Sequence, residues 1–207
     1  MNEEVIVQIN YWKEMRKELN KTMSQLSGIV LLTHNSVDFS GIIDFLNLVR
    51  KDEMLTTLYI SLIQSNDYIK DKLTIKPMKN KRLFVVDCVS HYVRNNHDTD
   101  DCIYKKTPYN LEEMKKLIED SIKYVNPNII IIDSLSQYIN FTMPTDNELN
   151  ELYKFLKSIK EDVLGIICYT VILIYDDKLG SMKKLPTLFT DLILKLEIIK
   201  ENIQWTD

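Results

Sequence analysis

The sequence predicts an α/β domain with a mostly parallel central β-sheet flanked by helices. Short apolar segments of strand length alternate with segments whose apolar residues recur every three or four positions, as strands and helices do in α/β folds. The segment NIIIID, residues 128–133, is a continuous apolar run typical of a strand buried on both faces of a parallel sheet. The chain has 207 residues and no internal repeat, which favours one core domain.

Residues 1–27 are expected to form an amphipathic helix ahead of a core domain that spans residues 28–207. Gly28 ends its apolar pattern. An apolar stripe of this kind packs either on the chain's own core or on a partner chain, and the sequence leaves both open. The residues of this interaction helix are Val5, Ile9, Trp12, Leu19 and Met23.

Three strands and two helices are expected in the first half of the core. The helices span residues 40–51 and 67–73, the second with Asn66 as its N-cap. Residues 91–107 are polar and predict a long loop. The strands are GIVLLTH at 28–34, LYISL at 58–62 and LFVVD at 83–87.

The second half continues the alternation of helices and strands. Asn110 followed by Glu113 resembles a capping box, and it starts a helix that Asn126-Pro127 ends. A second helix is expected to start at Asp146 as its N-cap. The strands expected in this half span residues 128–133, 163–169, 171–175 and 191–196.

Composition excludes several classes of protein. No apolar run reaches the roughly 18 residues of a membrane span, so no membrane partner is expected. The formal net charge of −4 disfavours nucleic acid, although cations interleaved with Tyr92 or Tyr104 leave single-stranded binding open. Three scattered cysteines fit a reduced, cytoplasmic setting, and the histidines and cysteines match no metal motif.

Polar residues at the strand ends and in the polar loop can be interpreted as functional or as structural. The acidic stretch from His97 to Cys102 could bind a cation, but a solvated loop is the preferred interpretation. Ser134 and Ser136 have no nearby histidine to activate them, so they are expected to bond backbone groups at a strand exit.

Four segments in order resemble the RecA superfamily, specifically its archaeal KaiC-like branch. GIVLLTHNSVDFSG stands where that family has its first strand and Walker A loop, and NIIIIDSLS where it has the Walker B strand. LYISLIQS resembles the strand that precedes the catalytic glutamate, and LFVVDCVS the next strand. The resemblance covers residues 28–196 and implies a RecA-like P-loop NTPase fold.

The family's Walker A pattern, G-x-x-x-x-G-K-[ST], is degenerate in this sequence. Its glycines let backbone N–H groups surround phosphate, its lysine neutralises charge, and its hydroxyl binds Mg²⁺. The two glycines, the lysine and the hydroxyl residue are all replaced, and the added carboxylate of Asp38 would repel a triphosphate. The corresponding residues are His34, Asn35, Ser36, Val37, Asp38, Phe39, Ser40 and Gly41.

The resemblance also locates two further parts of an ATPase site. Ile63 and Gln64 occupy the stretch where the family carries its catalytic glutamate, and neither side chain is a general base. Asp133, followed by Ser134, stands at the Walker B position, where an active enzyme would hold Mg²⁺. Alternatively, Asp133 simply ends a strand and bonds nearby backbone N–H groups.

These observations predict a non-catalytic interaction or regulatory protein without a cofactor. Its expected partners are copies of itself or an active RecA/KaiC-like ATPase. Two alternatives stay open: a divergent NTP-binding protein or weak NTPase that uses Asp133 and Gln64, and an accessory protein of DNA recombination that binds single strands.

Overall fold

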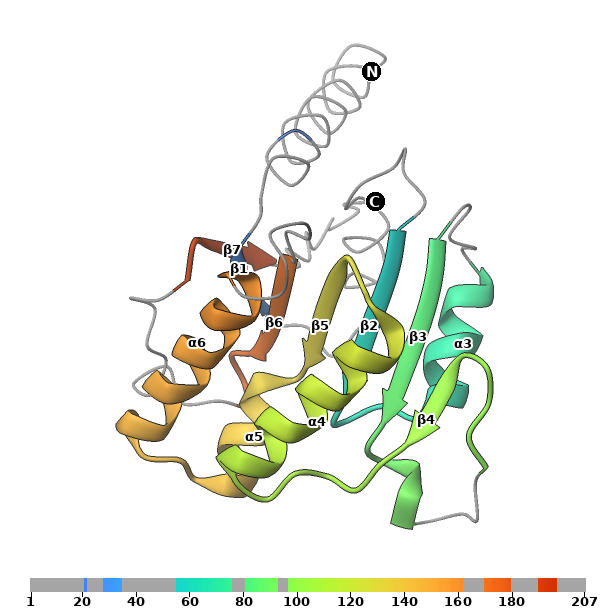
Figure 1. Ribbon diagram of the computed structural model, residues 1–207, viewed down its shortest axis with the longest axis horizontal. Coiled ribbons are helices and arrows are strands. Elements are labelled where there is room, and N and C mark those ends of the chain that lie inside the picture. Colours follow the sequence, from blue (N-terminus) through green and yellow to red (C-terminus); the bar gives the residue numbers. More distant parts are fainter. Residues whose placement is uncertain are drawn as a thin grey trace, which may run out of the picture.

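The computed structural model describes residues 21, 28–34, 55–75, 81–92, 97–161, 170–179 and 190–196. Over these residues the chain forms one seven-stranded sheet in which every strand pair is parallel (Figure 1). The order of the strands across the sheet is β4-β3-β2-β5-β6-β1-β7. The strands are β1 (Ile29–His34), β2 (Leu55–Ser61), β3 (Lys81–Asp87), β4 (Cys102–Tyr104), β5 (Ile129–Asp133), β6 (Thr170–Asp176) and β7 (Leu192–Leu196).

Helices lie on both faces of the sheet, as the sequence predicted. The helices α4 (Leu111–Val125), α5 (Leu135–Thr142) and α6 (Asp146–Glu161) contribute to the hydrophobic cluster on one face. The helix α3 (Asn66–Ile75) contributes Ile69 to the cluster on the other face (Figure 1). A short 3-10 turn, η1 (Ser90–Tyr92), follows β3.

The central strand β5 explains why its sequence is a continuous apolar run. Ile130 and Ile132 point into the cluster beneath α4, α5 and α6, whereas Ile129 and Ile131 point into the cluster with α3. Successive side chains of a strand point to opposite faces, and both faces of β5 are covered, so no position tolerates a polar residue until Asp133. The strand predicted at residues 128–133 is thereby confirmed.

Several predicted segments lie outside the described residues. They include the N-terminal helix with Val5, Ile9, Trp12, Leu19 and Met23, the helix at residues 40–51 and the strand at residues 163–169.

The ends of α4 follow the predicted signals. The side-chain oxygen of Asn110 accepts a hydrogen bond from the Glu113 N–H at 2.9 Å, while Glu113 in turn accepts from the Tyr109 N–H at 2.9 Å. The helix ends at Asn126, which adopts the left-handed conformation (φ 48°) and donates its N–H to the Ile122 carbonyl. Asparagine tolerates that conformation better than most residues, so the cap needs no glycine.

The loop predicted at residues 91–107 is wrong in part, because it contains the edge strand β4. Cys102 and Ile103 pair with Val85 and Val86 of β3. The outer side of β4 is closed within the chain: the Thr99 N–H donates to the Cys102 carbonyl at 2.8 Å, and the Tyr104 N–H donates to the Asp98 carboxylate at 2.9 Å. Asp98 therefore helps to terminate the sheet instead of lying in a purely solvated loop.

Two helix starts also differ from prediction. Helix α5 was not predicted, although Ser134 followed by Gln137 has the spacing of a capping box, and the Gln137 N–H donates to the Ser134 hydroxyl. The cap of α6 is Thr145, not Asp146, because Thr145 and Glu148 exchange side-chain to backbone hydrogen bonds. In α6 the threonine one residue earlier than predicted provides the cap, and in α5 a serine provides it.

Replacing Asn110 by alanine should remove the acceptor that holds the first turn of α4. We expect Asn110→Ala to lower the free energy of unfolding by about 1 kcal/mol, measured by urea denaturation. Glu119→Ala changes an exposed residue of the same helix and should stay within about 0.5 kcal/mol of the unmodified chain. Equal losses in the two variants would contradict the capping role.

Candidate functional site

Polar side chains gather where the parallel strands end. Ser61 of β2 is in register with both Asp87 of β3 and Asp133 of β5, and His34 of β1 is in register with Asp176 of β6. Residues in register on neighbouring strands point to the same face, and here that face carries α3. In open α/β sheets, ligands bind at the carboxyl ends of the strands, so this row of side chains is the candidate site.

Asp133 is buried at the centre of this row, with 1% of its surface exposed. One carboxylate oxygen accepts a hydrogen bond of 2.5 Å from the hydroxyl of Tyr59, which lies two residues before Ser61 on β2. The other oxygen, Oδ1, is buried and has no hydrogen-bond partner among the described residues. The alternative in which Asp133 bonds nearby backbone N–H groups is therefore wrong, because its partner is a side chain on the neighbouring strand.

Burial determines the protonation of this pair. Loss of solvent raises the pKa of the Asp133 carboxyl to about 6, the hydrogen bond from Tyr59 lowers it, and the charge of Asp176 raises it. Burial also raises the pKa of Tyr59, with the adjacent Asp133 charge as the second cause. The tyrosine therefore remains the proton donor of the pair.

Asp87 is also fully buried, but its carboxylate is saturated with donors. One oxygen accepts from the N–H groups of Val89 and Ser90, each at 2.8 Å. The other accepts from the Asn66 N–H and the Ser90 hydroxyl, each at 2.7 Å. Asp87 thus ties the start of α3 and the turn η1 to the end of β3, which is a structural role.

The exit of β2, where the resemblance locates a catalytic glutamate, is a tight turn. The Ser61 hydroxyl donates to the Gln64 carbonyl at 2.6 Å and accepts from the Gln64 N–H at 3.0 Å. The Leu62 N–H donates to the Asp133 carbonyl at 2.5 Å, which places the turn beside the exit of β5. Ile63 and Gln64 are half-buried, and no carboxylate occurs between Ser61 and Asn66.

Ser134 and Ser136 fix the exit of β5, as predicted. Ser134 caps α5, and its hydroxyl lies 2.9 Å from the hydroxyl of Ser136. Ser136 accepts from the Asp176 N–H at 3.2 Å, which joins the ends of β5 and β6. The peptide bond between Asp133 and Ser134 is cis.

Only the first residue of the predicted nucleotide loop is described. His34 is buried at the end of β1, and β6 separates it from β5. Two strand spacings correspond to about 10 Å, so the sheet brings His34 near Asp133 but not into contact with it. Asn35, Ser36, Val37, Asp38, Phe39, Ser40 and Gly41 lie outside the described residues.

The described part of the chain shows neither a metal-binding cluster nor a membrane-spanning helix. Within it, no group of three His, Cys, Asp or Glu residues is arranged to hold a metal ion. Among the same residues, no helix is both long and apolar enough to cross a bilayer.

Removing one acceptor oxygen of Asp87 should destabilise the fold. Asp87→Asn replaces one oxygen with an amide nitrogen, which leaves at least the buried Asn66 N–H without an acceptor, and we expect a loss of about 2 kcal/mol. Asp176→Asn is the matched control, because Asp176 is half-buried and accepts from the single N–H of Lys178. Urea denaturation of both variants checks this, and an equal effect would contradict the structural role of Asp87.

The buried Asp133 carboxyl should make stability depend on pH. An unfolded chain releases this proton near pH 3.8, whereas the folded chain holds it to about pH 6. Between these values the folded state binds more protons, so this residue's contribution to stability falls as pH rises. The full difference corresponds to about 3 kcal/mol.

Asp133→Asn cannot ionise, so its stability relative to the unmodified chain should increase from pH 4 to pH 7. Denaturation curves at a series of pH values measure this difference. Asp120→Asn, which changes an exposed residue of α4, is the control. Parallel pH profiles for Asp133→Asn and the unmodified chain would contradict the burial of an ionisable carboxyl.

Comparison with known proteins supports the fold and no more than the fold. No family model matches the sequence, and no curated protein matches it. Among solved structures, a KaiC-like protein of the hyperthermophilic archaeon Pyrococcus horikoshii OT3 matches with a TM-score of 0.58 and 15% identity, over 86% of this chain and 75% of that chain. The α/β fold with its parallel sheet therefore resembles that of a KaiC-like protein.

Proposed function

We propose that this chain is a non-catalytic member of the RecA/KaiC-like fold that acts as an interaction or regulatory protein. It would associate with itself or pair with an active relative and bias the state of that relative. The observation that carries this proposal is the burial of Asp133. Its carboxylate is shielded from solvent and accepts a hydrogen bond from the Tyr59 hydroxyl.

The strand ends also lack groups that nucleotide hydrolysis requires. Attack on a phosphoryl group requires a group that orients and deprotonates water, and the turn after β2 offers only the amide of Gln64. The other strand-end carboxylates, Asp87 and Asp176, accept backbone hydrogen bonds from their own chain. The loop sequence HNSVDFSG adds to this argument, because it lacks the lysine that neutralises phosphate.

One observation favours a second candidate, a divergent NTP-binding protein. The Oδ1 atom of Asp133 is buried without a partner among the described residues, and an unpaired buried oxygen is costly. A water molecule bound to a cation would satisfy that atom in a nucleotide complex. The second candidate therefore depends on Asp133 binding a cation that the first candidate does not need.

The first test measures mass in solution. The 24.4 kDa chain should elute from gel filtration with light scattering as a multiple of its own mass, or should form a complex with a KaiC-like ATPase from its own genome. A chain that stays monomeric both alone and with every such ATPase would contradict the proposal.

Thermal denaturation with Mg-ATP separates the two candidates. A ligand at a hundred times its Kd adds about 2.7 kcal/mol of stability, so an unchanged melting temperature supports the non-catalytic proposal. A rise that disappears in Asp133→Asn would support the NTP-binding candidate instead.

A further inference from the structure

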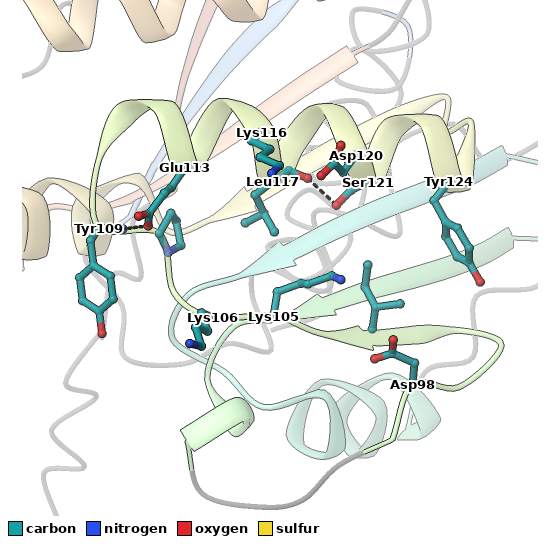
Figure 2. Close-up of a pocket in the computed structure, with 12 residues that line it drawn as sticks. Asp98, Lys105, Lys106, Tyr109, Glu113, Lys116, Leu117, Asp120, Ser121 and Tyr124 are labelled. Carbon is teal, nitrogen blue, oxygen red and sulfur yellow. Dashed lines mark hydrogen bonds between the residues drawn. The ribbon is translucent and has the colours of Figure 1, made fainter.

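A groove of about 660 Å³ lies between α4 and the segment around β4 (Figure 2). Its charges favour neither an acidic nor a basic occupant, because three lysines and three carboxylates line it. These residues are Lys105, Lys106, Lys116, Asp98, Glu113 and Asp120. Buried polar atoms without a partner, which do indicate a ligand, lie at a different place, the end of β6.

Two polar side chains at the end of β6 point to the face opposite the polar row of the candidate site. Tyr175 belongs to the hydrophobic cluster beneath α4, α5 and α6. Asp177 directly follows β6, and its N–H donates to the His34 carbonyl at 2.8 Å, just as the Val171 N–H donates to the Gly28 carbonyl at 2.9 Å. The ladder between β6 and β1 therefore continues as far as Asp177, which places its side chain on the same face as that of Tyr175.

Both of these groups are buried without a hydrogen-bond partner among the described residues. The Tyr175 side chain is 0% exposed, and its hydroxyl makes no hydrogen bond. The Oδ1 atom of Asp177 is also buried, and it accepts no hydrogen bond. Buried polar groups are rarely left in this state, because the loss of their hydration is then not offset.

The hydroxyl and the carboxylate lie close to one another. The pKa of Tyr175 is raised to about 12, chiefly by burial and next by the charge of Asp177. Alternate residues of a strand are about 6.6 Å apart along the chain, a separation that one small molecule can bridge. Tyr153 of α6 belongs to the same cluster, and its pKa is raised by burial and then by Tyr175, so α6 covers this place.

The chemistry of the two groups determines what can join them. A tyrosine hydroxyl donates one hydrogen, and an ionised carboxylate only accepts. Tyr59 donates directly to Asp133, but no such bond joins Tyr175 to Asp177. The bridging group must therefore accept from the hydroxyl and donate to the carboxylate. Water does both, whereas a metal or ammonium cation offers no acceptor for the hydroxyl hydrogen.

We propose that one ordered water molecule binds at the end of β6, where it accepts from the Tyr175 hydroxyl and donates to the Asp177 carboxylate. The water ties the turn after β6 to the core beneath α6. The same turn is held to α5, because the Asn140 side chain donates to the Leu179 carbonyl at 2.7 Å. This site goes beyond the proposed function and does not depend on it, since it requires neither a nucleotide nor a partner chain.

A crystal structure of the full chain, grown in rubidium chloride, tests the site directly. We expect a density peak at hydrogen-bond distance, roughly 2.7–3.2 Å, from both the Tyr175 hydroxyl and Asp177 Oδ1. The peak should give no anomalous signal at the rubidium edge. An anomalous signal there would identify a cation instead of water. That result, the absence of density, or a direct bond between the two side chains would overturn the proposal.

The stability of Tyr175→Phe tests the same site in solution. If the hydroxyl bonds a water, its removal should lower the urea midpoint of unfolding by about 0.5 M. If the hydroxyl has no partner, phenylalanine removes an unsatisfied group, and the midpoint should stay the same or rise, which would refute the bound water. Tyr124→Phe is the matched control, because Tyr124 is 67% exposed, and its midpoint should not change.

A double-mutant cycle shows whether Tyr175 and Asp177 share one ligand. Tyr175→Phe and Asp177→Ala each remove one partner of the water, so the second change should cost less once the first has been made. The double variant should therefore lose less stability than the sum of the two single variants. Strictly additive losses would show that the two groups act separately and would overturn the shared site.

Discussion

The structure depends on the burial of β5 from both sides at the centre of a parallel sheet. Its four isoleucines pack into two separate cores, so the strand can only lie between helices. Because the strands are parallel, their carboxyl ends meet at one edge, and the polar residues that follow each strand are brought together there. The fold therefore creates a polar row that water reaches poorly, and each member of that row needs a partner within the chain.

Asp87 and Asp133 meet this requirement in different ways. Asp87 accepts four hydrogen bonds, three of them from backbone N–H groups, so its charge is well stabilised by a rigid turn. Asp133 accepts one bond from a tyrosine hydroxyl and keeps one oxygen unpaired among the described residues, so burial raises its pKa. Asp133 thus keeps one buried oxygen without a partner among the described residues, whereas the carboxylate of Asp87 has a structural role. This contrast is why the non-catalytic proposal and the NTP-binding candidate both centre on Asp133.

The strand β4 lies at one edge of the sheet. There, β4 is closed on its outer side by Thr99 and Asp98, so the edge itself is not open to strand addition. The face of the same strand is covered by no described helix, and lysines and tyrosines surround it. Among the described residues, the chain therefore leaves this face of β4 uncovered while it protects the outer edge of the strand.

The sequence by itself determined the features that depend on near neighbours. Periodicity located most of the described strands and helices, the Asn110 and Glu113 spacing marked the start of α4, and the apolar run at residues 128–133 required a buried parallel strand. The sequence also contains the Ser134 and Gln137 spacing that starts α5, although no helix was predicted there. Only the tertiary structure decided that Tyr59 bonds Asp133, that Cys102–Tyr104 completes the sheet edge, and that a groove lies beside α4. These features join segments far apart in the chain, 74 residues in the case of Tyr59 and Asp133, and local propensity carries no information about which distant side chain a buried oxygen will meet.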